Sequence, residues 1–177
     1  MPYLRKASDN PFGMIPYDTI IRAQDYDTLA TQKIWAGDLV KMGSAGTVTL
    51  ANATTDALIV GVAANTVASS SASQKILVYD SPHQLFTIQD DSDTTHMAAT
   101  NIGNNVSVIG FTGSDTTDRS ILEADSSTAA TTDTLLLRVV RLHPVEGDSY
   151  ASAAGAQRKW VVQINPHRHY YATSTTI

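Results

Sequence analysis

The 177-residue sequence contains no cysteine, which excludes a disulfide framework and metal sites built on thiolates. Its longest apolar run, residues 57–64, is far shorter than the roughly 20 residues that a membrane-spanning helix needs. No apolar core of a secretory signal follows Arg5 and Lys6. We therefore expect no membrane partner, and a stability that comes from packing or oligomerisation.

Charged residues make up only 16% of the chain, and their distribution is uneven. Residues 1–35 are neutral overall, residues 36–135 carry a net charge of −8, and residues 136–177 carry +3. The body of the chain lacks the basic, aromatic-interleaved stripe that is typical of nucleic-acid-binding proteins. We therefore expect no nucleic-acid partner, because such binding depends mainly on cations that neutralise phosphates.

Motifs of common catalytic sites are also missing. Residues 43–46 read Gly-Ser-Ala-Gly, which is not the Gly-x-Ser-x-Gly elbow of hydrolases, and residues 103–105 lack the lysine of a phosphate loop. Only Glu123 and Glu146 are glutamates, so candidates for a glycosidase carboxylate pair are few. We expect no catalytic residues. A small hydrolase stays open as a third alternative, which a pocket with a converging histidine and carboxylate would support.

Two polar segments invite a metal-site interpretation. His167 and His169 would point to the same side of an extended chain, but no zinc-type spacing connects them to further ligands. Residues 90–93, Asp-Asp-Ser-Asp, lack the layout of a calcium-binding loop. We therefore expect no metal and no cofactor, and we interpret Asp93 as the cap of a short helix through residues 97–99.

What the sequence does contain is a series of short aliphatic and β-branched runs. The clearest group lies at residues 58–89, where the turn Asp80-Ser81-Pro82 separates two predicted strands because proline cannot donate to a ladder. Strands are predicted at 39–42, 47–50, 59–63, 75–79, 84–89, 106–110, 120–124, 135–142 and 160–164. About nine short strands and one short helix predict an all-β fold, an antiparallel barrel or sandwich.

The predicted organisation has three parts: an extended N-terminal arm at 1–33, a β-barrel domain at 34–166 and a C-terminal tail at 167–177. Prolines break any helix in the arm, which either crosses its own domain or reaches a neighbour. We expect partner contacts from aromatic and basic side chains of the arm and tail, since rigid aromatic rings favour interfaces. These residues are Tyr3, Arg5, Lys6, Phe12, Tyr17, Arg22, Tyr170 and Tyr171.

Several short motifs occur in one order along residues 37–167. They are Gly37-Asp38-Leu39-Val40, Ile59-Val60-Gly61-Val62-Ala63, Val78-Tyr79-Asp80-Ser81-Pro82, Phe86-Thr87-Ile88-Gln89, Asn101-Ile102-Gly103-Asn104-Asn105, Arg119-Ser120, Leu137-Arg138-Val139-Val140 and Val161-Val162-Gln163-Ile164-Asn165-Pro166-His167. In their order and spacing they resemble the cement, or head decoration, proteins of tailed bacteriophages.

This resemblance implies a non-enzymatic β-barrel on the outside of an icosahedral capsid, where it bridges major capsid proteins. The expected locations are the outer surface of the virion and, during assembly, the host cytoplasm. A homo-oligomer is expected, with dimer and trimer both open, and the basic C-terminal part would face an acidic capsid surface. The alternative function is a glycan- or receptor-binding head fibre domain, in which Tyr170 and Tyr171 would stack on a sugar.

Overall fold

The computed structural model describes residues 10–144 and 157–169, apart from positions 53, 55, 57, 71, 92, 94 and 112. Within them the regular secondary structure is almost entirely β, with eleven strands and two single-turn 3₁₀ helices. The strands are β1 Ile15–Pro16, β2 Gln24–Asp27, β3 Leu39–Met42, β4 Val48–Leu50, β5 Ile59–Ala63, β6 Lys75–Tyr79, β7 Leu85–Gln89, β8 Asn105–Ile109, β9 Glu123–Ala130, β10 Leu137–Leu142 and β11 Lys159–Ile164. The 3₁₀ helices are η1 Ser44–Gly46 and η2 Ala99–Asn101.

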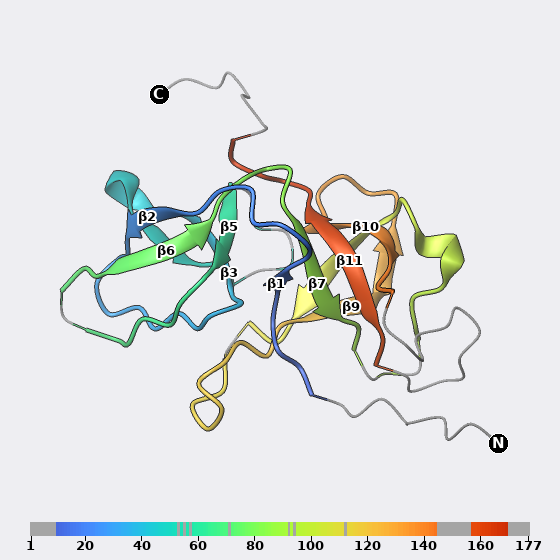
Figure 1. Cartoon of the computed structure of the whole chain (residues 1–177), viewed down its shortest axis with the longest axis horizontal. Helices are drawn as coiled ribbons and strands as arrows, with labels where there is room; N and C mark the ends of the chain where they lie inside the picture. Colours follow the sequence, from blue (N-terminus) through green and yellow to red (C-terminus); the bar gives the residue numbers. More distant parts are fainter. Residues whose placement is uncertain are drawn as a thin grey trace.

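The strands form two antiparallel sheets that lie side by side in Figure 1. One sheet has six strands in the order β1-β7-β11-β10-β8-β9, and the other has five in the order β2-β6-β5-β3-β4. The predicted all-β fold class is therefore confirmed, and the arrangement is consistent with its sandwich alternative. Neither sheet closes into a barrel within the described residues, so the barrel alternative predicted for 34–166 is wrong.

Both sheets are nevertheless curved. A bridge between Thr28 and Val48 brings the end of β2 to β4 across the five-stranded sheet, and a bridge between Asp90 and Ala124 brings the end of β7 to β9. Each bridge joins only one residue pair, so the ladders stay open elsewhere. Curvature of this kind lets a small sheet enclose its own apolar side chains.

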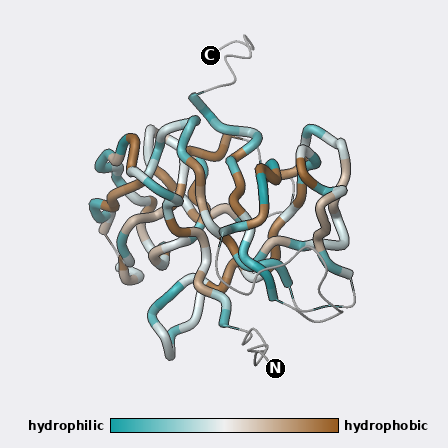
Figure 2. The backbone as a smooth tube through the Cα atoms, turned by 45° about the vertical axis from the view of Figure 1, so that its right-hand side comes forward, coloured by the Kyte–Doolittle hydropathy of each residue, from teal (hydrophilic) through white to brown (hydrophobic). Residues whose placement is uncertain are grey.

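The interior contains two apolar clusters. The larger cluster includes Phe86, Val139 and Trp160 of the six-stranded sheet together with Leu39 and Ile59 of the other sheet, so it joins the two sheets. The smaller cluster lies on the opposite side of the five-stranded sheet, with Val40, Val60 and Ile76 among its members. Figure 2 shows hydrophobic stretches of the tube, in brown, in both halves of the molecule. Both faces of β5 are consequently buried, and all five of its residues are inaccessible.

Most predicted strands are present within a residue or two of their predicted bounds, and 59–63 and 75–79 match β5 and β6. Two local predictions are wrong. The strand predicted at 120–124 is instead β9, Glu123–Ala130, which pairs with β8, and Ser126 within it donates a hydrogen bond to the buried Asp91. The helix expected at 97–99 is only the single turn η2, and Asp93 instead accepts a hydrogen bond from the N–H of Thr95.

The strands within residues 58–89 do not all belong to one sheet. β5 and β6 belong to the five-stranded sheet, whereas β7 belongs to the six-stranded sheet, so the turn Asp80-Ser81-Pro82 carries the chain from one sheet to the other. Gly61 is required in this region, because a Cβ atom there would lie 2.1 Å from the carbonyl oxygen of Tyr79. The turn that marked the end of a strand in the sequence is thus the crossing point of the fold.

The described part of the predicted arm is incorporated into both sheets. β1 pairs with β7, with Ile15 opposite Thr87, and β2 pairs with β6 along its whole length. The chain between them passes from the six-stranded to the five-stranded sheet, as the blue segment of Figure 1 shows. We call residues 10–27 the strap. Its extended conformation was expected, but it crosses its own domain, which is one of the two alternatives left open.

Candidate functional site

The strap is fixed to the body of the protein at several points along its length. The N–H of Met14 donates to the carbonyl of Gly37 at 2.9 Å, and the N–H of Tyr17 donates to the carbonyl of Leu85 at 2.8 Å. Farther along, the N–H of Ile21 donates to the side-chain oxygen of Gln84 at 2.8 Å. These hydrogen bonds from main-chain N–H groups hold the strap against Gly37 and against Gln84 and Leu85, just after the crossing turn, and they do not depend on the exposed side chains of the strap.

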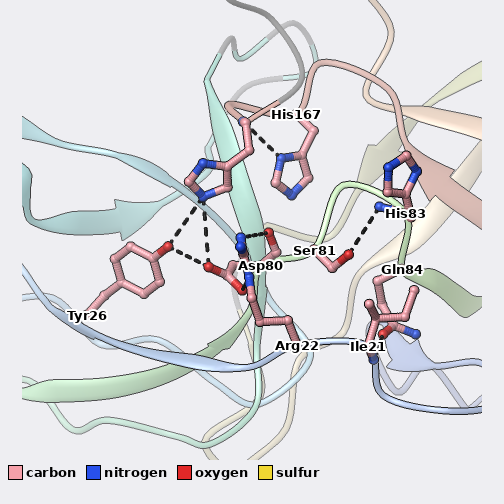
Figure 3. A network of polar contacts seen from close by, with 9 residues as sticks. Ile21, Arg22, Tyr26, Asp80, Ser81, His83, Gln84 and His167 are labelled. Atoms are coloured by element: carbon pink, nitrogen blue, oxygen red, sulfur yellow. Dashed lines mark hydrogen bonds and ion pairs between the residues drawn. The ribbon is translucent and has the colours of Figure 1, made fainter.

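Asp80 is the anchor at the far end of the strap. Its carboxylate is completely buried, and Arg22 Nε donates to Oδ1 at 2.7 Å while the Tyr26 hydroxyl donates to Oδ2 at 2.7 Å. Arg22 also donates to the carbonyl oxygen of Asp80 at 3.0 Å. Figure 3 shows these side chains converging on Asp80. A buried carboxylate is stable only with such partners, so Asp80 requires the strap to stay in place.

This arrangement determines the protonation states of Tyr26 and Arg22. Burial of the Tyr26 phenol, with the hydrogen bond to Asp80 as the second cause, raises its pKa to about 12. The hydrogen bond to Asp80 raises the pKa of Arg22. Tyr26 is therefore a neutral donor and Arg22 a cation at neutral pH, which is the combination that a carboxylate needs.

Two histidines complete the surroundings of Asp80. His169 Nε2 lies 3.8 Å from Asp80 Oδ2, and the N–H of His169 donates to His167 Nδ1 at 3.2 Å. His167 is buried, and this burial, with the nearby His169 as the next cause, lowers its pKa to about 4. Since Nδ1 accepts a hydrogen bond, neutral His167 carries its proton on Nε2, which has no hydrogen-bond partner among the described residues.

This protonation pattern bears on the metal interpretation of the two histidines. A metal at His167 Nε2 would move the proton to Nδ1 and break the bond from the His169 N–H. Across the described residues, no three metal-ligating side chains come together in a metal-binding group. None of the helices in this part of the chain is long and apolar enough to span a membrane.

Three isoleucines are among the exposed residues of the strap, beside polar and charged residues such as Asp18 and Asp25. Ile15, Ile20 and Ile21 are 48%, 50% and 57% exposed. The three isoleucines lie within seven residues of one another, on a segment whose main chain is bound to both sheets. Single exposed apolar residues are common on protein surfaces, but a group on one fixed segment is typical of a contact surface.

A groove of about 570 Å³ runs beside the beginning of the strap. Its lining includes the apolar residues Phe12, Met14 and Ile15 and the cationic residues Arg119 and Lys159. The ammonium group of Lys159 lies 5.9 Å from the centre of the Phe12 ring. The lining of the groove therefore combines apolar and cationic side chains.

The structure assigns different positions to the predicted contact residues. Phe12 lies in the groove, and Arg22 is bound to Asp80. Tyr17 packs edge-on against His143, with ring centroids 5.3 Å apart, and its hydroxyl accepts a hydrogen bond from Arg141. The other predicted contacts, Tyr3, Arg5, Lys6, Tyr170 and Tyr171, lie outside the described residues.

Sequence reasoning missed the exposed isoleucines and the role of Asp80. The signal for Asp80 was an aspartate at the end of an aliphatic strand and one residue before Ser81-Pro82, which was interpreted only as a strand stop. Comparison with protein-family models, with curated proteins and with solved structures found no match for this chain.

Proposed function

We propose that this chain is a non-enzymatic structural protein that attaches to the outside of an icosahedral phage capsid and cements neighbouring major capsid proteins. The ordered sequence motifs at 37–167 suggest the capsid as partner. The observation that carries the proposal is the strap, whose isoleucines 15, 20 and 21 are about half exposed on a segment bound to both sheets.

Rigid presentation of these side chains favours binding, because little conformational entropy is lost when the partner covers them. Burial of apolar surface contributes roughly 25 cal/mol per Å², so each isoleucine that becomes covered stabilises the complex modestly. A capsid offers many equivalent sites, and modest contacts repeated over them can stabilise the whole particle. The attachment therefore needs neither catalytic groups nor a deep pocket.

Substitution of the outward side chains tests the proposal. Ile20→Ser combined with Ile21→Ser leaves the main-chain bond of Ile21 to Gln84 intact and removes only exposed apolar surface. The matched control combines Ile102→Ser with Ile109→Ser, two isoleucines that are 41% and 36% exposed outside the strap. Binding to empty phage shells that lack this chain is measured by co-sedimentation.

We expect the strap variant to bind shells at least about tenfold more weakly, the size of effect that contact residues of an interface typically show. The control should bind like the unsubstituted chain. Equal binding by both variants would show that the strap is not the contact surface. Deleting residues 1–25 is a poorer test, because the deletion also removes Arg22 and leaves the buried Asp80 without its cation.

A further inference from the structure

Eight of the ten arginine and lysine side chains in the described residues fall into two groups; the other two are the buried Arg158 and Arg168, which follows β11 near the end of the described chain. Four of them form ion pairs with carboxylates: Arg22 with Asp80, Lys33 with Asp115, Lys41 with Asp56 and Lys75 with Asp27. Four others have no carboxylate partner in the described part of the chain and gather on one side of the six-stranded sheet: Arg119, Arg138, Arg141 and Lys159. We call these four residues the basic face.

Strand geometry places three of them on the outward side of that sheet. Leu137 and Val139 point into the larger core, so Arg138 between them points outward and is exposed. Arg141 lies opposite Val161 in the ladder between β10 and β11, and residues directly opposite each other share one face of a sheet. Lys159 precedes the core residue Trp160 and so faces outward too.

The same region lacks carboxylates. Strands β1, β7, β11 and β10 are neighbours in the sheet, and their sequences contain no aspartate or glutamate. The fourth cation, Arg119, lines the groove beside Lys159 and His143, and no carboxylate lines it within the described residues. In a chain with a net charge of −5, this is a local concentration of unpaired positive charge.

Aromatic residues of the strap help to position these cations. The guanidinium of Arg141 lies 5.1 Å from the centre of the Tyr17 ring and donates a hydrogen bond to its hydroxyl. Lys159 lies near the face of Phe12. Cation–π contacts hold these charges in place without neutralising them, which leaves them available to an anion.

We propose that the basic face and the groove beside it bind an extended protein segment rich in aspartate and glutamate. The inference rests on the proposed function in one respect: the capsid protein would supply this acidic segment. A protein segment fits better than a nucleic acid because most residues that line the groove beside these cations are apolar, which suits the apolar side chains that a protein segment can carry between its acidic ones.

The probe is a fluorescently labelled decaglutamate peptide, and its binding to the full chain is followed by fluorescence anisotropy at about 20 mM and 200 mM NaCl. The test variant combines Arg138→Gln with Arg141→Gln. The control combines Lys33→Gln with Lys75→Gln, which removes the same two charges from cations that already have carboxylate partners. A single-stranded oligothymidylate of equal charge serves as the nucleic-acid probe.

We expect decaglutamate to bind, to weaken with salt, and to lose about tenfold in affinity in the test variant but not in the control, since each exposed charge contact contributes up to about 1 kcal/mol. Equal losses in both variants, or no binding, would overturn the inference. Tighter binding of the oligothymidylate would overturn it in favour of nucleic acid.

Shell binding by the same variants separates this inference from the proposed function. Unchanged shell binding by the Arg138→Gln, Arg141→Gln variant would refute the idea that the capsid protein supplies an acidic segment to the basic face. It would leave the proposed attachment through the strap intact. Decaglutamate binding through the basic face by a chain that binds no shell would support the acidic-segment site and refute the capsid function.

Discussion

Acidification should destabilise the protein through His167. The imidazole is buried, and this burial lowers its pKa to about 4 in the folded state from the ordinary histidine value of 6.5. Protonation at Nδ1 would end the hydrogen bond from the His169 N–H and place a cation near Arg22 and the other imidazoles, His83 and His169, with only Asp80 to oppose it. Neutral His167 is therefore the form that the fold requires.

The difference between the folded and unfolded pKa of His167 sets the direction and the size of the loss of stability on acidification. A group with a lowered folded-state pKa contributes its full stability above the unfolded pKa of about 6.5, and the contribution disappears as the pH falls toward 4. The total is about 3 kcal/mol at 1.36 kcal/mol per pKa unit, and about 2 kcal/mol of it is lost by pH 5.

Two buried carboxyl groups act in the opposite direction. Burial raises the pKa of Asp38 to about 6 and that of Asp90 to about 7, so their contribution to stability increases as the pH falls through this range. The pH dependence of the unsubstituted chain alone is consequently a poor measure of His167. A difference between two chains at each pH isolates its contribution.

The assay is urea unfolding followed by tryptophan fluorescence at pH 7.5, 6.5, 5.5 and 5.0, for the unsubstituted chain and for His167→Asn. The asparagine carbonyl can replace Nδ1 as acceptor, but it does not titrate. The stability advantage of the unsubstituted chain should shrink by about 2 kcal/mol between pH 7.5 and pH 5. His167→Gln should show the same change whatever its stability at pH 7.5. A constant difference across this range would refute the reasoning.

Three further predictions concern the stability of the fold, measured by the same unfolding assay. Asp80→Ala should cost about 3 kcal/mol or more by leaving Arg22 and Tyr26 without their acceptor, whereas Tyr26→Phe should cost only about 1 kcal/mol; equal costs would contradict the role of Asp80 as anchor. Gly61→Ala should destabilise by at least about 2 kcal/mol, because its methyl group meets the carbonyl of the neighbouring strand, and an unchanged unfolding midpoint would argue against this close approach. Ala45→Gly should stabilise by about 0.5 kcal/mol because Ala45 has φ of 54°, and a loss of stability would show that this backbone carries no strain.

Local strand positions were predictable from the sequence because period and composition act over a few residues. β5 and β6 are aliphatic and β-branched between clear turn signals, and their bounds were predicted correctly. The strand predicted at 120–124 covers only the first two residues of β9, because the remaining residues are small and polar and Ser126 among them binds a distant partner, the buried Asp91. A pattern confined to one segment contains no information about that partner.

The division into two sheets could not be predicted for a similar reason. Nothing in the sequence 58–89 distinguishes strands that pair with one another from strands that separate at Asp80 into two sheets. The position of the strap was not predictable either, because it depends on the contact between Arg22 and Asp80, which are 58 residues apart in the sequence. By contrast, the positive charge of residues 136–177 was visible in the sequence, and only the sheet register shows that Arg138 and Arg141 face outward.

Saturation of empty phage shells tests the proposed attachment to a capsid most directly. Increasing amounts of the chain are mixed with phage shells that lack it, and bound chain per capsid protein is measured by sedimentation, together with the temperature at which the shells disrupt. The proposed function predicts saturation at a fixed ratio and a higher disruption temperature. Binding that never saturates, or saturation without any gain in shell stability, would contradict it.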